Sequence, residues 1–239
     1  MSKFSPVSFK VPDLDKSYKF GTYDYSAPAV KEANKKMLIG INTNYGNLIR
    51  YWGNVFEIPA NVVLAFIATE SGGKMAKPNK FQATGLMQVT PVAIWDCAQK
   101  WNVEVDAPMP KEAVSEINKK VPELLRKGST LNNSNRLRIL ALLEKDPSFN
   151  IMAGCLVLRW LLDRFSSVLG GGQLNKAMVA YNAGAYTRAI NKGTTAITTP
   201  IDTLSLATNR QVPSQSRDYL YKMLGKDGFL SLLYQQKAI

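Results

Sequence analysis

The sequence contains no histidine, the side chain most often used for acid–base catalysis near neutral pH. This absence excludes the Ser-His-Asp and Cys-His nucleophile systems and the zinc hydrolases that bind their metal through histidine. The two cysteines, Cys97 and Cys155, are far apart and form no Cys-x-x-Cys pattern, so we expect two buried thiols and no metal site. Acid–base chemistry in this chain has to use carboxylate, tyrosine or lysine side chains.

Long apolar segments are also absent. No stretch reaches the roughly 18 uninterrupted apolar residues of a transmembrane helix. The first residues, "MSKFSPVSFKVPDLDKSYKF", lack the apolar core of roughly 7 to 15 residues that marks a secretory signal. We therefore expect a chain that is made in the cytoplasm without a signal peptide and that has no transmembrane segment.

Acidic residues are few, since 18 Asp and Glu stand against 30 Lys and Arg, which gives a net charge of +12. This charge favours an anionic partner, such as nucleic acid, an anionic membrane surface or an anionic cell-wall polymer. A generic solvated basic surface explains it equally well. The basic residues occur in twos and threes and no nucleic-acid-binding motif is present, so we expect no specific nucleic-acid partner.

Helical spacing of apolar residues dominates from residue 46 onward and strand patterns are few, which predicts a mainly α fold. Residues 1–45 are rich in Pro, Ser, Tyr and Lys, and we expect an extended N-terminal docking arm with one short helix in 27–38. Residues 46–225 are predicted to form the main domain. Within it, 102–147 is a polar, basic stretch that we interpret as two or three amphipathic helices broken at Pro122 and Gly128. Residues 226–239 are predicted to form a C-terminal helical tail.

Glu70 ends an otherwise apolar helix, in the segment "IPANVVLAFIATESGG". Phe66 and Ile67 lie four and three residues earlier, so they share a helical face with Glu70 and its carboxyl points toward apolar surroundings. Desolvation and the negative end of the helix dipole both raise a carboxyl pKa. These effects favour a protonated glutamate that serves as a general acid. The alternative is a surface glutamate at a frayed helix end.

Two further segments carry polar side chains suited to a sugar site. "GLMQVTP", Gly85 to Pro91, opens on a glycine and presents Gln88, whose amide can make paired hydrogen bonds with a ligand. "AYNAG", Ala180 to Gly184, offers the phenol of Tyr181 and the amide of Asn182. A helix cap with a packing tyrosine explains the second segment equally well.

Taken in order, these segments resemble the soluble lytic transglycosylases, which are relatives of goose-type lysozyme. The resemblance covers roughly residues 46–224. It implies a lysozyme-like catalytic domain of the SLT type and four motifs, which appear here as Glu70-Ser71, "GLMQ" followed by Pro91, "NIMAG" at Asn150 to Gly154, and "AYNAG".

The resemblance also implies residue roles. Glu70 would be the single catalytic acid and base, and Tyr181 would place its hydroxyl near the catalytic carboxyl. The substrate-binding residues would be Ser71, Met87, Gln88, Tyr181 and Asn182, with a cap at the helix end as the alternative role for Ser71. The chain departs from the family pattern where Gln215 and Ser216 replace a Glu-Thr pair, although Arg217 and Tyr219 are retained. The stretch between Pro91 and Asn150 is also longer than is common in the family, so the resemblance implies that 102–147 is an inserted helical lobe.

No second carboxylate is expected near the motifs, because Asp96 follows on a new helix and Asp146 precedes "NIMAG". The resemblance implies that one glutamate suffices: it cleaves the β-1,4 bond between N-acetylmuramic acid and N-acetylglucosamine and forms a 1,6-anhydromuramic product without metal or cofactor. The alternatives are a water-using muramidase or endolysin with the same pocket, and a structural virion module with secondary activity.

The expected partners are peptidoglycan glycan strands and, through the N-terminal arm, other virion or assembly proteins. A bacteriophage virion component that opens the cell wall during genome entry fits a wall-cleaving enzyme without a signal peptide. The alternative settings are a holin-released endolysin and a bacterial enzyme whose leader is missing.

Overall fold

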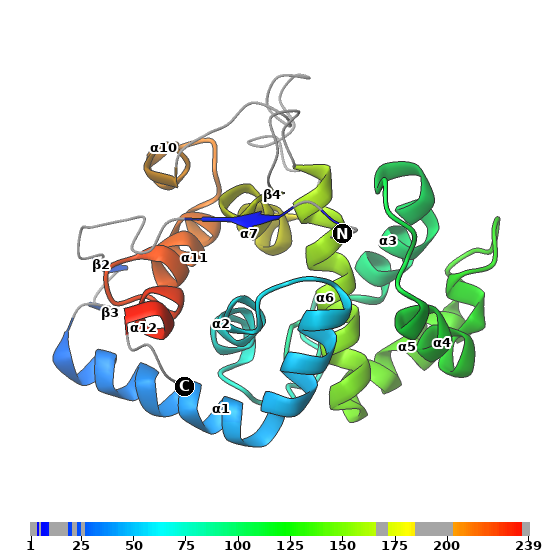
Figure 1. Cartoon of the computed structure of the whole chain (residues 1–239), viewed down its shortest axis with the longest axis horizontal. Coiled ribbons are helices and arrows are strands. Elements are labelled where there is room, and N and C mark those ends of the chain that lie inside the picture. Colours follow the sequence, from blue (N-terminus) through cyan, green and yellow to red (C-terminus); the bar gives the residue numbers. More distant parts are fainter. Residues whose placement is uncertain are drawn as a thin grey trace.

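The computed structural model describes residues 4, 6–9, 19–20, 23–24, 27–165, 172–184 and 203–235, and these residues confirm a mainly α fold (Figure 1). The helices are α1 (Pro28–Val55), α2 (Ala60–Ser71), α3 (Pro91–Glu104), α4 (Lys111–Lys120), the 3-10 helix η1 (Pro122–Leu124), α5 (Asn133–Lys145), α6 (Pro147–Arg164), α7 (Leu174–Ala183), α10 (Thr203–Thr208), α11 (Ser214–Leu224) and α12 (Phe229–Gln235). The strands of the described part have two residues each: β1 (Val7–Ser8) pairs in parallel with β4 (Gly172–Gln173), and β2 (Lys19–Phe20) pairs antiparallel with β3 (Tyr23–Asp24).

The core is organised around α2 and α6, which lie in the middle of the molecule (Figure 1). Every residue of α2 from Val62 to Ala68 is buried, and so is every residue of α6 from Phe149 to Leu162. Helices that are apolar on all sides must be surrounded by other helices. Here α1 packs against both, α3 and α7 pack against α6, and α11 and α12 pack against α2. Each large apolar side chain buried in this way stabilises the fold by roughly 1.5–3 kcal/mol.

Helix α1 is continuous from Pro28 to Val55. The short separate helix expected in 27–38 was therefore wrong, and the expected boundary between arm and domain at residue 45 falls inside this helix. Gly40 and Gly46 weaken helix propensity but do not break the helix, since Leu38, Ile41 and Ile49 are buried along one face. The division of the chain into an arm, a domain and a tail stays a prediction.

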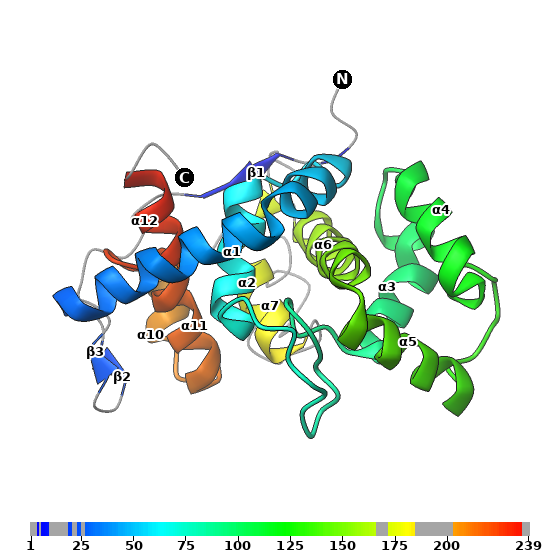
Figure 2. The same ribbon diagram turned by 90° about the horizontal axis from the view of Figure 1, so that it is seen from below.

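The helices α4, η1 and α5 lie within residues 102–147 and form a lobe that packs beside α3 and α6 (Figure 2). That this lobe is an insertion in the domain stays a prediction. The chain turns where the sequence indicated, because η1 starts at Pro122 and Gly128 adopts a φ of +75°. Lys120 joins the end of α4 to Asp146, the residue that caps the start of α6. The lobe is thus fixed to the core by an ion pair as well as by buried apolar residues, which include Ile117, Leu124, Ile139 and Leu143.

Residues near the start of the N-terminal arm pack against other elements of the same chain. Phe4 is buried, with its ring edge-on to Trp101 at a centroid distance of 6.1 Å and the guanidinium of Arg159 at 5.2 Å. Phe9 contacts Tyr234 of α12 at 5.3 Å, and β1 pairs with β4. These contacts hold the arm against α3, α6 and the C-terminal region. A partner that docks on the arm stays a prediction.

Both cysteines are free and buried, as expected. None of the described helices combines the length and the hydropathy needed to cross a bilayer. In the part of the chain that the structure describes, no group of three or more Cys, Asp or Glu side chains is arranged to hold a metal ion.

Candidate active site

Glu70 is the penultimate residue of α2, and the helix stops there because of the two glycines that follow. Gly72 adopts a left-handed conformation with a φ of +61°, and its N–H donates to the carbonyl of Ala68. Gly73 also has a positive φ, and a Cβ at this position would lie 2.4 Å from the side chain of Ile41. The chain can therefore turn away directly after Glu70 and leave its carboxyl at a cavity wall.

The carboxyl of Glu70 is largely withdrawn from water and accepts one hydrogen bond. Its Oε1 accepts from the hydroxyl of Tyr219 at 2.8 Å. Burial raises the pKa of Glu70 to about 7, while the Tyr219 hydrogen bond and the charge of Lys222 oppose this rise. Burial also raises the pKa of Tyr219 well above its usual range, so this hydroxyl remains a donor. A substantial fraction of Glu70 is thus protonated near neutral pH, as a general acid requires.

The side chain of Asn150 holds the "GLMQ" segment in place. Its Oδ1 accepts from the N–H of Met87, and its Nδ2 donates to the carbonyls of Thr84 and Leu143, each at 2.9 Å. Gly85 has a φ of +76°, and a Cβ there would lie 2.0 Å from Asn150 Nδ2. The first residue of "NIMAG" thus positions the neighbouring motif from inside the core.

Gly154, the last residue of "NIMAG", leaves room for the Met87 side chain, because a Cβ on it would lie 2.2 Å from Met87 Sδ. Met87 is fully buried and does not line the cavity. Its expected role in substrate binding was therefore wrong: the side chain packs in the core, and its carbonyl accepts a hydrogen bond from Tyr181.

Ser71 does not reach the cavity either. Its hydroxyl donates to the carbonyl of Ile67 at 3.2 Å and accepts from the N–H of Gly73 at 3.2 Å. These bonds satisfy polar groups at the end of α2, so the structure favours the helix cap, the alternative role that the sequence left open for Ser71.

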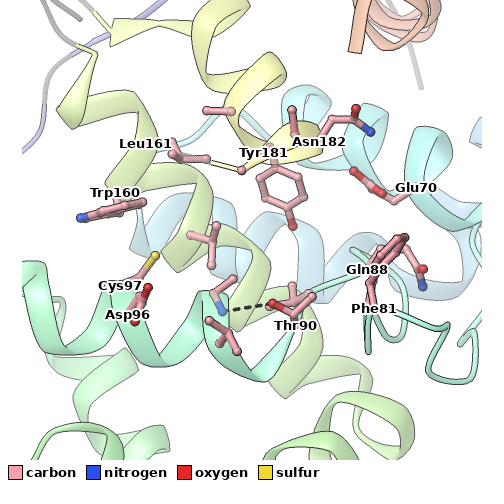
Figure 3. A pocket seen from close by; sticks show the side chains of 18 of the residues that line it. Glu70, Phe81, Gln88, Thr90, Asp96, Cys97, Trp160, Leu161, Tyr181 and Asn182 are labelled. Carbon is pink, nitrogen blue, oxygen red and sulfur yellow. Dashed lines mark hydrogen bonds between the residues drawn. The ribbon is translucent and has the colours of Figure 1, made fainter. Parts of the chain in front are cut away.

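Gln88, Tyr181 and Asn182 line the cavity together with Glu70 (Figure 3). Gln88 has a φ of +48°, and its Nε2 donates to the carbonyl of Gly85 at 2.9 Å. Asn182 is exposed, and its Oδ1 accepts from Ser216 at 2.7 Å. These three side chains are therefore brought to the site that the motifs predicted.

Tyr181 and Tyr219 flank the ring of Phe66 at centroid distances of 5.0 and 6.0 Å. The Tyr181 hydroxyl donates to the carbonyl of Met87 at 2.9 Å. The hydroxyl that donates to Glu70 is that of Tyr219. Tyr181 lies near Glu70, as expected, since both line the cavity and burial, together with the charge of Glu70, raises the pKa of Tyr181. The sequence reasoning missed Tyr219 as the donor to the Glu70 carboxyl.

The cavity has a volume of about 650 Å³. Figure 3 shows Glu70, Gln88 and Phe81 along one side and Asp96, Cys97 and Trp160 along the other. A cavity of this size accommodates a sugar-sized ligand. The remaining lining residues are Asn79, Ala83, Val89, Thr90, Val92, Ala93, Val157, Leu161, Ala180, Ala183, Gly184 and Gln215.

Asp96 corrects the expectation that no second carboxylate lies near the motifs. It sits on the first turns of α3, on the face that also carries Val92 and Ala93, and all three line the cavity. The signal was present in the sequence, because residues spaced by three and four share a helical face. Asp96 is paired with Lys100 at 3.6 Å, so its charge is partly neutralised.

Residues 47–115 match the transglycosylase SLT domain. The matched range contains Glu70 and the "GLMQ" segment and ends before Asn150 and Tyr181. No curated protein matches the chain. Together with the helical architecture, the match identifies the fold as mainly α and lysozyme-like, and it supports a lytic transglycosylase domain that acts on peptidoglycan.

If Glu70 is the general acid of a peptidoglycan-cleaving site, substituting Tyr219 with Phe should move the pH dependence of cleavage. The lost hydrogen bond stabilises the carboxylate, so its removal raises the pKa of Glu70 further above 7. Because the general acid must be protonated, kcat/KM falls as pH rises through this pKa. The alkaline limb should move to higher pH by about half a unit or more, the effect of one hydrogen bond to a charged acceptor.

The measurement is kcat/KM on peptidoglycan from pH 5 to pH 9. Tyr181→Phe is the matched control, because its hydroxyl donates to a backbone carbonyl and not to Glu70. That variant should change the rate without moving the alkaline limb. A limb that stays in place for Tyr219→Phe would contradict the assigned role of Tyr219.

Proposed function

We propose that this chain is a peptidoglycan lytic transglycosylase in which Glu70 acts first as general acid and then as general base. The observation that carries this proposal is a half-buried carboxyl, with its pKa raised to about 7, at the wall of a sugar-sized cavity. The SLT match supports the same substrate class.

In the first step, protonated Glu70 donates its proton to the glycosidic oxygen between N-acetylmuramic acid and N-acetylglucosamine. The C–O bond breaks, N-acetylglucosamine leaves as an alcohol, and the muramyl N-acetyl oxygen shares the positive charge at the anomeric carbon. The Tyr219 hydroxyl stabilises the Glu70 carboxylate formed in this step, because it already donates to Oε1.

In the second step, the Glu70 carboxylate takes the proton from the muramyl 6-hydroxyl. That oxygen attacks the anomeric carbon and closes the 1,6-anhydro ring. Glu70 is again protonated, so protons balance over the cycle and no metal or cofactor takes part. A carboxyl whose pKa lies near the working pH serves both steps, because neither protonation state is strongly favoured.

A water-using muramidase is the second candidate, and the position of Asp96 favours it. Glycosidases that use water or a covalent intermediate need a second carboxylate beside the sugar. Asp96 lies on the wall of the same cavity, although Figure 3 shows it across from Glu70.

The test is mass spectrometry of the products from purified sacculi digested in heavy-oxygen water. The proposed route predicts 1,6-anhydromuramic ends without heavy oxygen, and Asp96→Asn should still give the same product. Reducing muramic ends that carry heavy oxygen would reject the proposed route in favour of hydrolysis. Loss of that label in Asp96→Asn would then assign Asp96 as the second carboxylate.

We also propose that the chain is made in the cytoplasm and acts in the cell wall as a bacteriophage virion component that opens it during genome entry. The net charge of +12 supports a wall setting, because it favours contact with anionic wall polymers. Absence of the chain from purified virions, assayed by mass spectrometry, would reject the virion setting.

A further inference from the structure

The segment between α2 and the "GLMQ" motif projects from the body of the molecule (Figure 2). We call residues 74–82, "KMAKPNKFQ", the rim loop. It carries Lys74, Lys77 and Lys80, all exposed, and no acidic residue occurs between Glu70 and Asp96. The rim loop is therefore a cationic segment that begins four residues after the catalytic carboxyl.

Hydrogen bonds fix the conformation of the rim loop. The Oδ1 of Asn79 accepts from the N–H groups of Phe81 and Ala83 at 2.8 and 3.1 Å. The N–H of Gly85 donates to the carbonyl of Ala76 at 2.8 Å, which closes the base of the loop. The loop thus presents its side chains without a large ordering cost on binding.

An apolar rim forms where this loop meets the cavity. Phe81 is 72% exposed and Val92 is 52% exposed, and both line the cavity that contains Glu70. Single exposed apolar residues are common, but two at one cavity mouth indicate a contact surface for a ligand. The Nζ of Lys80 lies 4.9 Å from the centroid of the Phe81 ring. The positive charge of Lys80 is therefore close to the side chain of Phe81 at the cavity mouth.

The positive charge of the rim loop is not neutralised locally. Several cations elsewhere in the fold form ion pairs, as Lys31 does with Asp227, Lys100 with Asp96 and Lys120 with Glu116. Within the described residues, no ion pair is formed by the three rim-loop lysines. Asn79 and Phe81 of the rim loop line the cavity, so the three lysines lie on a segment that borders it. Uncompensated charge on such a segment attracts ligands of opposite sign and raises their association rate.

We infer that the rim loop, through Lys74, Lys77, Lys80 and Phe81, binds the anionic stem peptide of the substrate strand. This inference rests on the proposed function. The peptide is attached to the muramyl sugar whose glycosidic bond Glu70 would cleave, so its carboxylates leave the cavity close to the catalytic centre. The positively charged lysines attract these carboxylates, and the apolar ring of Phe81 packs against the peptide. The preferred substrate would then be a strand that carries peptides.

Comparison of two substrates tests this inference: soluble glycan strands with their stem peptides, and the same strands stripped of peptides by an amidase. The triple variant Lys74→Gln, Lys77→Gln, Lys80→Gln should lose about fivefold to twentyfold in kcat/KM on strands with peptides, and less than about twofold on stripped strands. The loss should shrink at about 0.5 M salt, which screens exposed charges. Phe81→Ala should also lower kcat/KM more on strands with peptides than on stripped strands.

The matched control is Lys111→Gln, Lys119→Gln, Lys127→Gln, which removes the same charge from exposed positions of the helical lobe. This control triple should change kcat/KM by the same factor on the two substrates. Binding of both strands to the Glu70→Gln protein, with and without the rim-loop substitutions, gives a readout that needs no catalysis. The rim-loop substitutions should weaken binding only of the strands with peptides.

Equal losses on both substrates, or equal losses in the rim-loop and control triples, would overturn the inference and leave the proposed function intact. Failure of the parent protein to cleave either substrate would overturn both.

Discussion

Glu70→Gln is expected to lower the rate of peptidoglycan cleavage by at least about a thousandfold. Glutamine keeps the size of the side chain and can still contact Tyr219, but it can neither donate nor accept the proton. A general acid or base contributes roughly 10²–10⁴-fold in rate, and one glutamate serves both roles in the proposed route. Release of soluble muropeptides from purified sacculi measures the loss.

The same substitution should stabilise the folded protein at alkaline pH. The pKa of Glu70 is raised from 4.5 to about 7 on folding, so the folded state holds a proton that the unfolded state releases. The contribution of Glu70 to the free energy of unfolding is therefore fully present below about pH 4.5. It is lost as pH rises from about 4.5 through 7. Glutamine has no such pH dependence. Relative to the parent, it should gain about 1–3 kcal/mol at pH 8 after allowance for partial exposure, and little at pH 4.5.

Urea unfolding of both proteins at pH 4.5 and pH 8 tests this sign. Glu112→Gln, at an exposed position of α4, is the control and should shift stability alike at both pH values. An inactive Glu70→Gln protein whose stability difference does not change with pH would refute the raised pKa while leaving the catalytic role. A Glu70→Gln protein that cleaves sacculi at the parent rate would refute the catalytic role itself.

Local spacing in the sequence was enough to predict the parts of the site that depend on one element. Glu70 follows an apolar helix and precedes two glycines, so its position and its raised pKa were predictable from α2 alone. Gln88, Tyr181 and Asn182 lie in short motifs, and the structure brings all three to the cavity.

The parts that depend on packing between distant elements were not predictable in the same way. Tyr219 contacts Glu70 across 149 positions in the chain, and only the packing of α11 against α2 selects it over Tyr181. Ser71 and Met87 have side chains of the right type within their motifs. Whether such a side chain faces the cavity or the core depends on the rotation of the backbone relative to its neighbours.

Asn150→Ala is expected to be the most destabilising single substitution among the motif residues, with a loss of about 3–5 kcal/mol in the free energy of unfolding. Asn150 is fully buried and makes three hydrogen bonds to backbone groups. Alanine leaves the Met87 N–H and the carbonyls of Thr84 and Leu143 without these partners. Each buried polar group that loses its partner costs roughly 1–3 kcal/mol. Urea unfolding at pH 7 measures the total, and Asn118→Ala, at an exposed position of α4, should change stability by less than about 0.5 kcal/mol.

Activity of the folded Asn150→Ala fraction separates a positioning role from simple loss of stability. The "GLMQ" segment carries Gln88 into the cavity and provides the Met87 carbonyl that holds Tyr181, so a loosened segment should raise KM. The hydrogen bond from Tyr219 to Glu70 does not involve Asn150, so the alkaline limb of the pH profile should stay where the parent has it. A large loss of stability with unchanged KM would show that the segment keeps its shape without Asn150. A displaced alkaline limb would instead show that Asn150 influences the pKa of Glu70 by a route other than its three hydrogen bonds.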